Sequence, residues 1–167
     1  ESTVSKVREG DKSKKKELPI ALFSGVFDGR KDQDLKSHSG LVVLDFDHID
    51  VQESKGLLGT DDYVLACWAS PSGDGLKALV KVSNPDKHRD HFRSLQSYFE
   101  SQYGLEVDPS GVNEARACYE SHDPDLVINT TAQPFGMMLS EKALDQSAEL
   151  KVGNTYTDYG KLNIVCA

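Results

Sequence analysis

One short run of the sequence, residues 41–49, constrains the fold more than any other part of the chain. It reads Leu-Val-Val-Leu-Asp-Phe-Asp-His-Ile, and Gly40 and a polar stretch bound it. Apolar, β-branched runs of this length are typical of a buried central strand. Because side chains alternate along a strand, one face carries Val42, Leu44, Phe46 and His48, and the other carries Leu41, Val43, Asp45, Asp47 and Ile49. We therefore expect a core strand with two aspartates on one face.

Two further strands and a helix follow it. Residues 63–69 and 76–82 are strand-like, and the loop Ser-Pro-Ser-Gly-Asp-Gly between them predicts a hairpin. In residues 84–104, apolar side chains recur near helical spacing between a possible cap, Asn84, followed by proline, and a stop, Gly104. This pattern predicts an amphipathic helix.

The remaining segments complete an α+β pattern. Residues 105–108, 115–121 and 126–129 look extended, and residues 140–150 could form one more helix. The order of elements predicts a mostly antiparallel sheet with helices on one face. The other face of the sheet would then carry the two aspartates.

The domain organisation follows from length and local composition. The chain has 167 residues, enough for one ordinary core. We expect a polar lead-in at 1–17, a core at 18–138 and a C-terminal helix and tail at 139–167 leading to further domains of a longer protein. The only basic run, Lys14–Lys16, is either part of a solubilising tail or a phosphate-binding patch.

Charge, hydropathy and cysteine content narrow the function. A net charge of −8 argues against nucleic-acid binding through bulk charge, so a polyanion would have to bind locally. No apolar stretch approaches the roughly 18 residues of a membrane span, and we expect no membrane partner. Three cysteines without zinc-like spacing favour a reducing, cytoplasmic location.

The paired aspartates are the first candidate site. Asp45 and Asp47, side by side on a buried strand, would repel each other unless something offsets their charge. A divalent cation such as Mg²⁺ would do so, and Mg²⁺ is typically held by one or two carboxylates and substrate phosphates. If repulsion dominates without metal, Asp45→Asn should raise stability. The alternative is that the chain simply leaves the core at these residues.

The Gly-rich hairpin and a later acidic turn are weaker candidates. Ser72, Gly73 and Gly75 could expose backbone N–H groups to phosphates, or form an ordinary turn. Alternation sets Lys77 apart from the more apolar face of its strand, and a lysine on the aspartate face would be a phosphate ligand.

Taken in order, these motifs resemble a known family. Leu-Asp-Phe-Asp, Ser-Pro-Ser-Gly-Asp-Gly-Leu-Lys and the segment from Leu105 to Asn129 are similar to VirE N-terminal-type domains of the archaeo-eukaryotic primase superfamily, over about residues 18–135. Asp45 and Asp47 match its Asp-x-Asp metal pair, and Asp108 matches its third acidic residue. Lys77 stands where many members have histidine. Arg116 falls where related domains place a basic residue.

The resemblance implies an RRM-like primase-polymerase core from a mobile-element or phage-like DNA replication protein. Asp45, Asp47 and Asp108 would be catalytic and would hold two Mg²⁺ or Mn²⁺ ions. The triphosphate of a nucleoside triphosphate would lie on a second set of residues, namely Ser72, Gly73, Gly75, Lys77 and Arg116. A single-stranded or primed nucleic-acid template and a helicase domain in the same parent chain are the implied partners.

Two other functions stay open. Lys77 in place of histidine favours a non-catalytic descendant that binds nucleic acid or a partner. A strand with Asp-x-Asp also begins metal-dependent phosphatases, with Asp45 as nucleophile and Asp47 as acid, although no late acidic pair on a strand follows.

The histidines and the other acidic pairs have simpler interpretations. Alternation puts His48 on the core face as a structural residue. His88 and His91 stand at the start of the predicted helix, where a solvated end is expected. The acidic groups Asp61–Asp62 and Asp123–Asp125 are interpreted as turn residues that bond nearby backbone.

Overall fold

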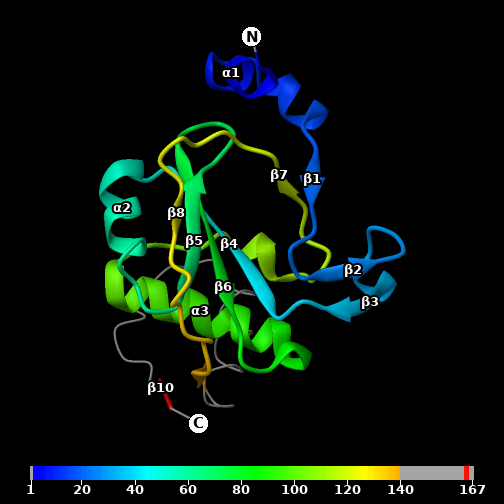
Figure 1. The fold of residues 1–167 in the computed structure, drawn as a ribbon, viewed down its shortest axis with the longest axis vertical. Coiled ribbons are helices and arrows are strands. Elements are labelled where there is room, and N and C mark those ends of the chain that lie inside the picture. The colour runs from blue at the N-terminus through cyan, green and yellow to red at the C-terminus, as the bar shows by residue number, and fades with distance from the viewer. Residues whose placement is uncertain (1, 140–163, 166–167) are drawn as a thin grey trace, which may run out of the picture.

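A four-stranded antiparallel sheet forms the centre of the computed structural model, which describes residues 2–139 and 164–165. Its strand order is β4-β6-β5-β8 (Figure 1). The strands span Leu41–Asp47 (β4), Val64–Ala69 (β5), Gly75–Lys81 (β6) and Val127–Ile128 (β8). The predicted strand at 41–49 and the hairpin β5–β6 are confirmed. The expected central position is wrong, because β4 lies at one edge of the four-stranded sheet, beside β6. The strand ends at Asp47, two residues earlier than expected.

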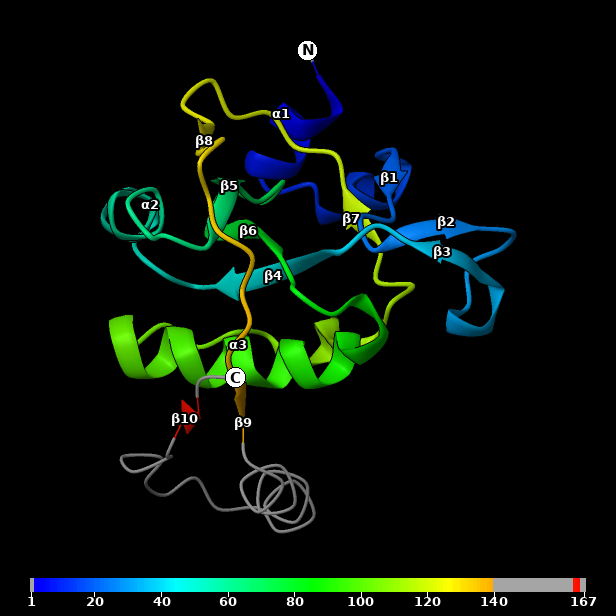
Figure 2. The same cartoon turned by 60° about the horizontal axis from the view of Figure 1, so that its bottom comes forward.

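Two helices pack on one face of this sheet, as predicted. The long helix α3, His88–Tyr103, runs across the sheet (Figure 2), and α2, Val51–Leu58, adds Leu58 to the same core. Asn84 accepts a hydrogen bond from the backbone N–H of Asp86 and caps the 3₁₀ turn Pro85–Lys87 that leads into α3. Gly104 ends the helix at φ +66°, in the left-handed conformation that glycine adopts without strain.

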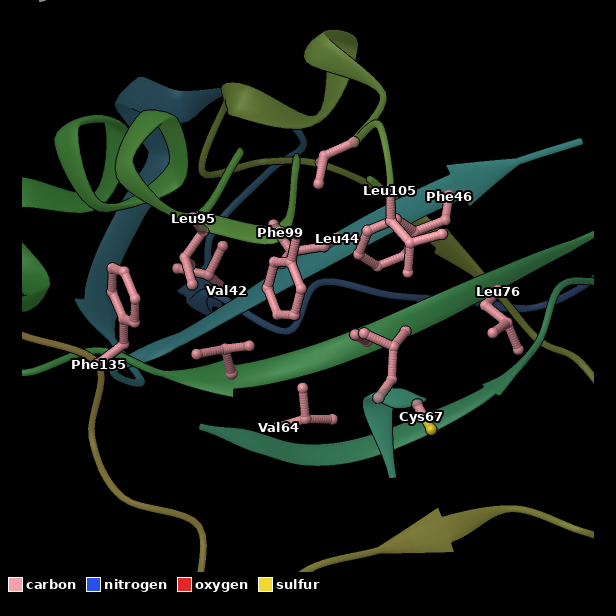
Figure 3. Close-up of a cluster of buried hydrophobic side chains, with 14 of the residues drawn as sticks. Val42, Leu44, Phe46, Val64, Cys67, Leu76, Leu95, Phe99, Leu105 and Phe135 are labelled. Carbon is pink, nitrogen blue, oxygen red and sulfur yellow. The ribbon is translucent and has the colours of Figure 1, made fainter. Parts of the chain in front are cut away.

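The main core lies between the sheet and α3 (Figure 3). Phe46 of β4 meets Phe99 of α3 edge to face, with ring centroids 5.5 Å apart. Burying each such aromatic contributes roughly 1.5–3 kcal/mol. The fully buried large side chains include Val42, Leu44, Phe46, Val64, Leu76, Leu95, Phe99 and Phe135. All the members of the core face predicted for residues 41–47 are among them.

Two short strand pairs lie on the opposite side of the sheet from α3. Strand β1, Ile20–Ala21, pairs with β7, Cys118–Tyr119, and β2, Gly25–Phe27, pairs with β3, Leu35–His38. A small second cluster, Val43, Leu79 and Cys118 with partly buried neighbours such as Trp68, lies on this side. The β2–β3 hairpin stands at the edge of the molecule in both ribbon views (Figures 1 and 2). Residues 105–108, expected to be extended, form no strand and lead into the 3₁₀ turn η4, Pro109–Val112.

The N-terminal segment is more structured than its composition suggests. It forms helix α1, Thr3–Arg8, and a 3₁₀ helix η1, Lys12–Glu17. Val4 and Val7, three residues apart, share one side of α1 and are buried with Leu18 against Tyr119. The expectation of a wholly solvated lead-in is therefore wrong.

Buried acidic side chains fix two turns. Asp61 accepts hydrogen bonds from the backbone N–H of Tyr63 and from the hydroxyls of Tyr98 and Tyr103, at 2.7–2.8 Å. Asp123 pairs with the buried Lys55 at 2.6 Å and accepts from the N–H of Asp125. Both contacts with nearby backbone confirm the turn interpretation, and the distant partners tie these turns to α3 and α2.

The predicted environments of three histidines are wrong. His48 follows the end of β4 with φ +56°, and its side chain is 85% exposed beside Asp74. The strand ends before His48, so alternation no longer places it in the core. His88 and His91 are 3% and 1% exposed, because the first turn of α3 faces the core and His38, which bonds His88 at 2.9 Å.

The described chain ends in a short strand pair. Strand β9, Met138–Leu139, pairs with β10, Ile164–Val165. The helix predicted at 140–150 lies outside the described residues. Among the residues that the structure describes, no helix is long and apolar enough to span a membrane.

Candidate functional site

Asp45 and Lys77 form the centre of the candidate site. They are directly opposite each other in the register of β4 and β6, on the face away from α3. Their side chains form an ion pair and are only 11% and 8% exposed. Lys77 therefore lies on the aspartate face, as alternation predicts, and neutralises the aspartate there.

Asp108 and Arg116 complete this group. The backbone N–H of Asp108 donates to the carbonyl oxygen of Asp45 at 2.8 Å, which holds the start of η4 against β4. Nη2 of Arg116 lies 3.2 Å from Asp45 Oδ2 and 3.0 Å from Asp108 Oδ2. Four of the predicted residues thus meet at one place, although Asp45 and Arg116 are 71 residues apart in sequence.

Local hydrogen bonds keep Asp108 ionised. Burial alone would raise the pKa of Asp108, but the hydroxyl and N–H of Ser110 together with Arg116 outweigh it and lower that pKa below its usual value. Ser110 also accepts from Nη1 of Arg116 at 3.0 Å. Ser110 is not among the residues predicted from the sequence, where its only signal is its position two residues after an aspartate, as in an Asx turn.

Asp47 stands apart from this group. It is exposed, and its side chain makes no hydrogen bond or ion pair with any residue that the structure describes. Its neighbour across the sheet is Gly75, where an added Cβ would lie 2.4 Å from the carbonyl oxygen of Phe46. Gly75 is therefore needed for the close approach of the loop to the end of β4.

Two backbone N–H groups of the Gly-rich hairpin loop donate hydrogen bonds to carbonyl oxygens of the same loop. The N–H of Gly73 donates to the carbonyl of Ser70 at 3.0 Å, and the N–H of Ser70 donates to the carbonyl of Gly75 at 2.8 Å. Ser72 bonds Asp74 and thereby lowers the pKa of that carboxyl. In this conformation Gly73 offers no free amide, while the loop as a whole lies at the end of β4, beside Asp47.

A polar cavity of about 430 Å³ opens beside Arg116. One wall comes from the β2–β3 turn and the other from the chain between η4 and β7. Its lining residues are Arg30, Lys31, Asp32, Ser110, Asn113, Ala115, Arg116 and Ala117. No local motif marks Arg30 or Lys31 in the sequence, because the two walls are about 80 residues apart and only the tertiary fold joins them.

The donor set fits a divalent ion in part. Oxygens of Asp45 and Asp108 approach one guanidinium nitrogen, so both carboxylates face a common point that already holds positive charge. Mg²⁺ is commonly held by one or two carboxylates and completes its shell with water and phosphate oxygens. Asp47 does not provide a third ligand, because the described residues contain no group of three acidic, histidine or cysteine side chains positioned to hold a metal ion.

The fold and site define an α+β domain whose antiparallel sheet carries a cluster of acidic and basic side chains on the face away from α3. Comparison with family models gives the more particular assignment: the chain belongs to the BT4734-like, N-terminal domain family, whose model matches residues 13–127. This match includes every residue of the cluster and the cavity. No curated protein and no solved structure matched the chain.

Proposed function

We propose that this domain is a primase-polymerase-like nucleotidyltransferase core, with an RRM-like sheet, from a mobile-element or phage-like replication protein. One observation carries the proposal: Asp45 and Asp108 face a common point, and Lys77 and Arg116 are held at the same place. Two carboxylates with two cations suit a reaction in which a metal and a chain of phosphates share one site.

The acidic residues would hold Mg²⁺ or Mn²⁺. When bound, the metal neutralises phosphate charge and lowers the pKa of an attacking hydroxyl. Asp45 and Asp108 provide the oxygens, and the depressed pKa of Asp108 keeps its carboxylate ionised near neutral pH. Asp47 is exposed at the end of the same strand and lies on the solvent side of the site.

The basic residues would bind the nucleotide. Lys77 and Arg116 neutralise Asp45 in the free protein, and both can transfer to phosphate oxygens once another cation takes their place. Nε of Arg116 is buried without a hydrogen-bond partner among the described residues, so its present position leaves one donor unsatisfied. Lys77 would bind phosphate through its positive charge. A histidine at this position could also take up or release a proton near neutral pH, which lysine does not.

A non-catalytic module is the second candidate, and a specific observation favours it. Asp45 is already neutralised by two cations, and the described residues show no third carboxylate in the cluster. A domain that only binds a single-stranded or primed nucleic acid, or a neighbouring helicase domain, does not need a third carboxylate to hold a metal ion.

Template-dependent nucleotide incorporation tests the proposal. The chain is incubated with a primed template, nucleoside triphosphates and Mn²⁺, beside Asp45→Asn and Asp108→Asn variants. We expect incorporation by the parent and a loss of at least about a hundredfold in each variant. Asp125→Asn, a change at an exposed turn carboxylate, serves as the matched control. Template binding without incorporation by the parent would select the non-catalytic module.

Metal binding gives a second measurement. A ligand that binds only the native state raises the melting temperature, so Mn²⁺ with a nucleotide should stabilise the parent. Asp45→Asn should lose this gain, while Asp125→Asn keeps it. An equal gain in all three proteins would mean that the ion binds elsewhere and would remove the support for metal at the cluster.

A further inference from the structure

We propose that the cavity beside Arg116 is a pocket for a phosphate group, in which Arg30 and Lys31 are binding residues. This inference rests on the proposed function and deepens it, since it gives the site a second contact with its polyanionic substrate. The phosphate belongs either to the backbone of the nucleic-acid strand or to the tail of the nucleotide. The pocket, defined by the lining residues given above, is called the Arg30 pocket below.

The charge of the pocket is positive. Arg30 and Lys31 are exposed and form no ion pair with the described residues. Asp32 is the one carboxylate in the lining, and both of its oxygens are engaged: Oδ1 accepts the N–H of Ala115 at 2.9 Å and Oδ2 accepts from Arg89 at 2.8 Å. An anion entering the pocket therefore meets unpaired positive charge on a domain whose net charge is −8.

The two walls of the pocket are clamped together. The bond from Ala115 to Asp32 joins chain segments 83 residues apart, and Arg89 of α3 links Asp32 to Glu114 through contacts of 2.8–3.3 Å. These contacts hold the β2–β3 turn against the segment that carries Arg116. Since the cations are kept near each other before a ligand arrives, less ordering is needed on binding.

The chemistry of the lining favours phosphate over a base. It contains no aromatic and no large aliphatic side chain, only charged and polar residues and two alanines. Bases are held by stacking on aromatic rings, which this pocket does not offer. Arginine with neighbouring serine and asparagine donors suits phosphate oxygens. Arg116 lines the pocket and also contacts Asp45 and Asp108, so the phosphate would lie next to the carboxylate cluster.

Binding to two probes tests the Arg30 pocket without metal. A fluorescein-labelled oligothymidine of about twenty nucleotides and ATP are titrated separately in EDTA, by anisotropy and calorimetry. The double variant Arg30→Ala/Lys31→Ala should raise the Kd of one probe about tenfold. For the oligonucleotide, removing two phosphate contacts should lower the salt slope of log K by about 1.4. Lys81→Ala/Lys87→Ala, which removes two exposed cations outside the lining, is the charge-matched control.

The probe whose binding is lost identifies the source of the phosphate in the Arg30 pocket. Loss with the oligonucleotide alone assigns the pocket to a strand, and loss with ATP alone assigns it to the nucleotide tail. A change no larger than that of the control for both probes overturns the pocket. An Arg30→Lys/Lys31→Arg variant keeps the charge and should keep binding, which separates charge from misfolding.

The pocket and the reaction fail in different ways. If the parent incorporates no nucleotide but the double variant loses phosphate binding, the Arg30 pocket stands and nucleotidyl transfer does not. If the parent incorporates nucleotide and the double variant binds both probes normally, only the pocket is wrong.

Discussion

Replacing Asp45 by asparagine should destabilise the metal-free protein. From sequence alone, the repulsion expected between Asp45 and Asp47 predicts the opposite sign. In the structure Asp45 contacts Lys77 and Arg116, while Asp47 is exposed. Removing the carboxylate charge leaves Lys77, whose side chain is 8% exposed, as a buried cation without its anion.

The size of the effect follows from burial and from what asparagine retains. Removing one partner of a buried ion pair costs about 3–5 kcal/mol. Asparagine keeps a carbonyl oxygen that can accept from Lys77, and Arg116 keeps Asp108, so we expect a loss of about 2–3 kcal/mol. For a chain of this size, this corresponds to a fall in melting temperature of about 5–10 °C.

Urea unfolding measures this loss. The chain has one tryptophan, Trp68, opposite Lys77 in the register of β5 and β6, so its fluorescence reports on this face of the sheet. The matched control is Asp47→Asn on the same strand, which should change stability by no more than about 0.5 kcal/mol. Asp45→Asn/Lys77→Met should recover most of the loss, because it removes both members of the pair.

Two results would refute this reasoning. An Asp45→Asn protein as stable as the parent, or more stable, would mean that repulsion rather than pairing governs the carboxylate. A double variant that is less stable than Asp45→Asn would show that Lys77 contributes through packing or another partner rather than through the ion pair.

Three further predictions concern the framework around the site. Burial lowers the pKa of His88 from 6.5 to about 4, so the unfolded state binds more protons between those pH values. The free energy of unfolding should therefore fall by about 2 kcal/mol from about pH 7.5 to pH 5. Urea unfolding of His88→Gln should show a smaller fall over the same range, and an equal fall would contradict the lowered pKa of His88. Asp61→Asn should cost about 2–3 kcal/mol in urea unfolding, since one oxygen of Asp61 accepts from both Tyr98 and Tyr103, and an unchanged midpoint would mean that these bonds are dispensable. Gly75→Ala should cost about 2 kcal/mol, because its Cβ would press on a carbonyl oxygen of β4; a normal melting temperature would show that the loop can move aside.

Where signals are local, the sequence was sufficient. The capping Asn84 and the stop at Gly104 bracket the long helix as predicted. Alternation along residues 41–47 separates the core face from the face of Asp45, and the same period sets Lys77 apart from the apolar face of its own strand. These features depend on backbone geometry that repeats every two or 3.6 residues, so neighbouring residues suffice to specify them.

Local signals misled where a residue's surroundings come from elsewhere in the chain. His88 looks like a solvated helix end, yet the approach of His38 and the core buries it. Val4 and Val7 look too few to matter in a polar segment, yet Leu18 and Tyr119 give them a place to pack. Burial is decided by the path of distant segments, which no short window of sequence contains.

The same distinction between local sequence signals and tertiary contacts applies to the candidate site. The sequence by itself determined on which strand face or turn each residue stands: an aspartate on the polar face of one strand, a lysine off the apolar face of a later strand, and an aspartate before a turn. Only the tertiary structure paired those two strands. Only the tertiary structure decided that Arg116 lies between Asp45 and Asp108, that Asp47 stays outside the cluster, and that a cationic turn faces Arg116 across a cavity. The physical reason is that charges interact over a few ångströms of space, whatever their separation along the chain.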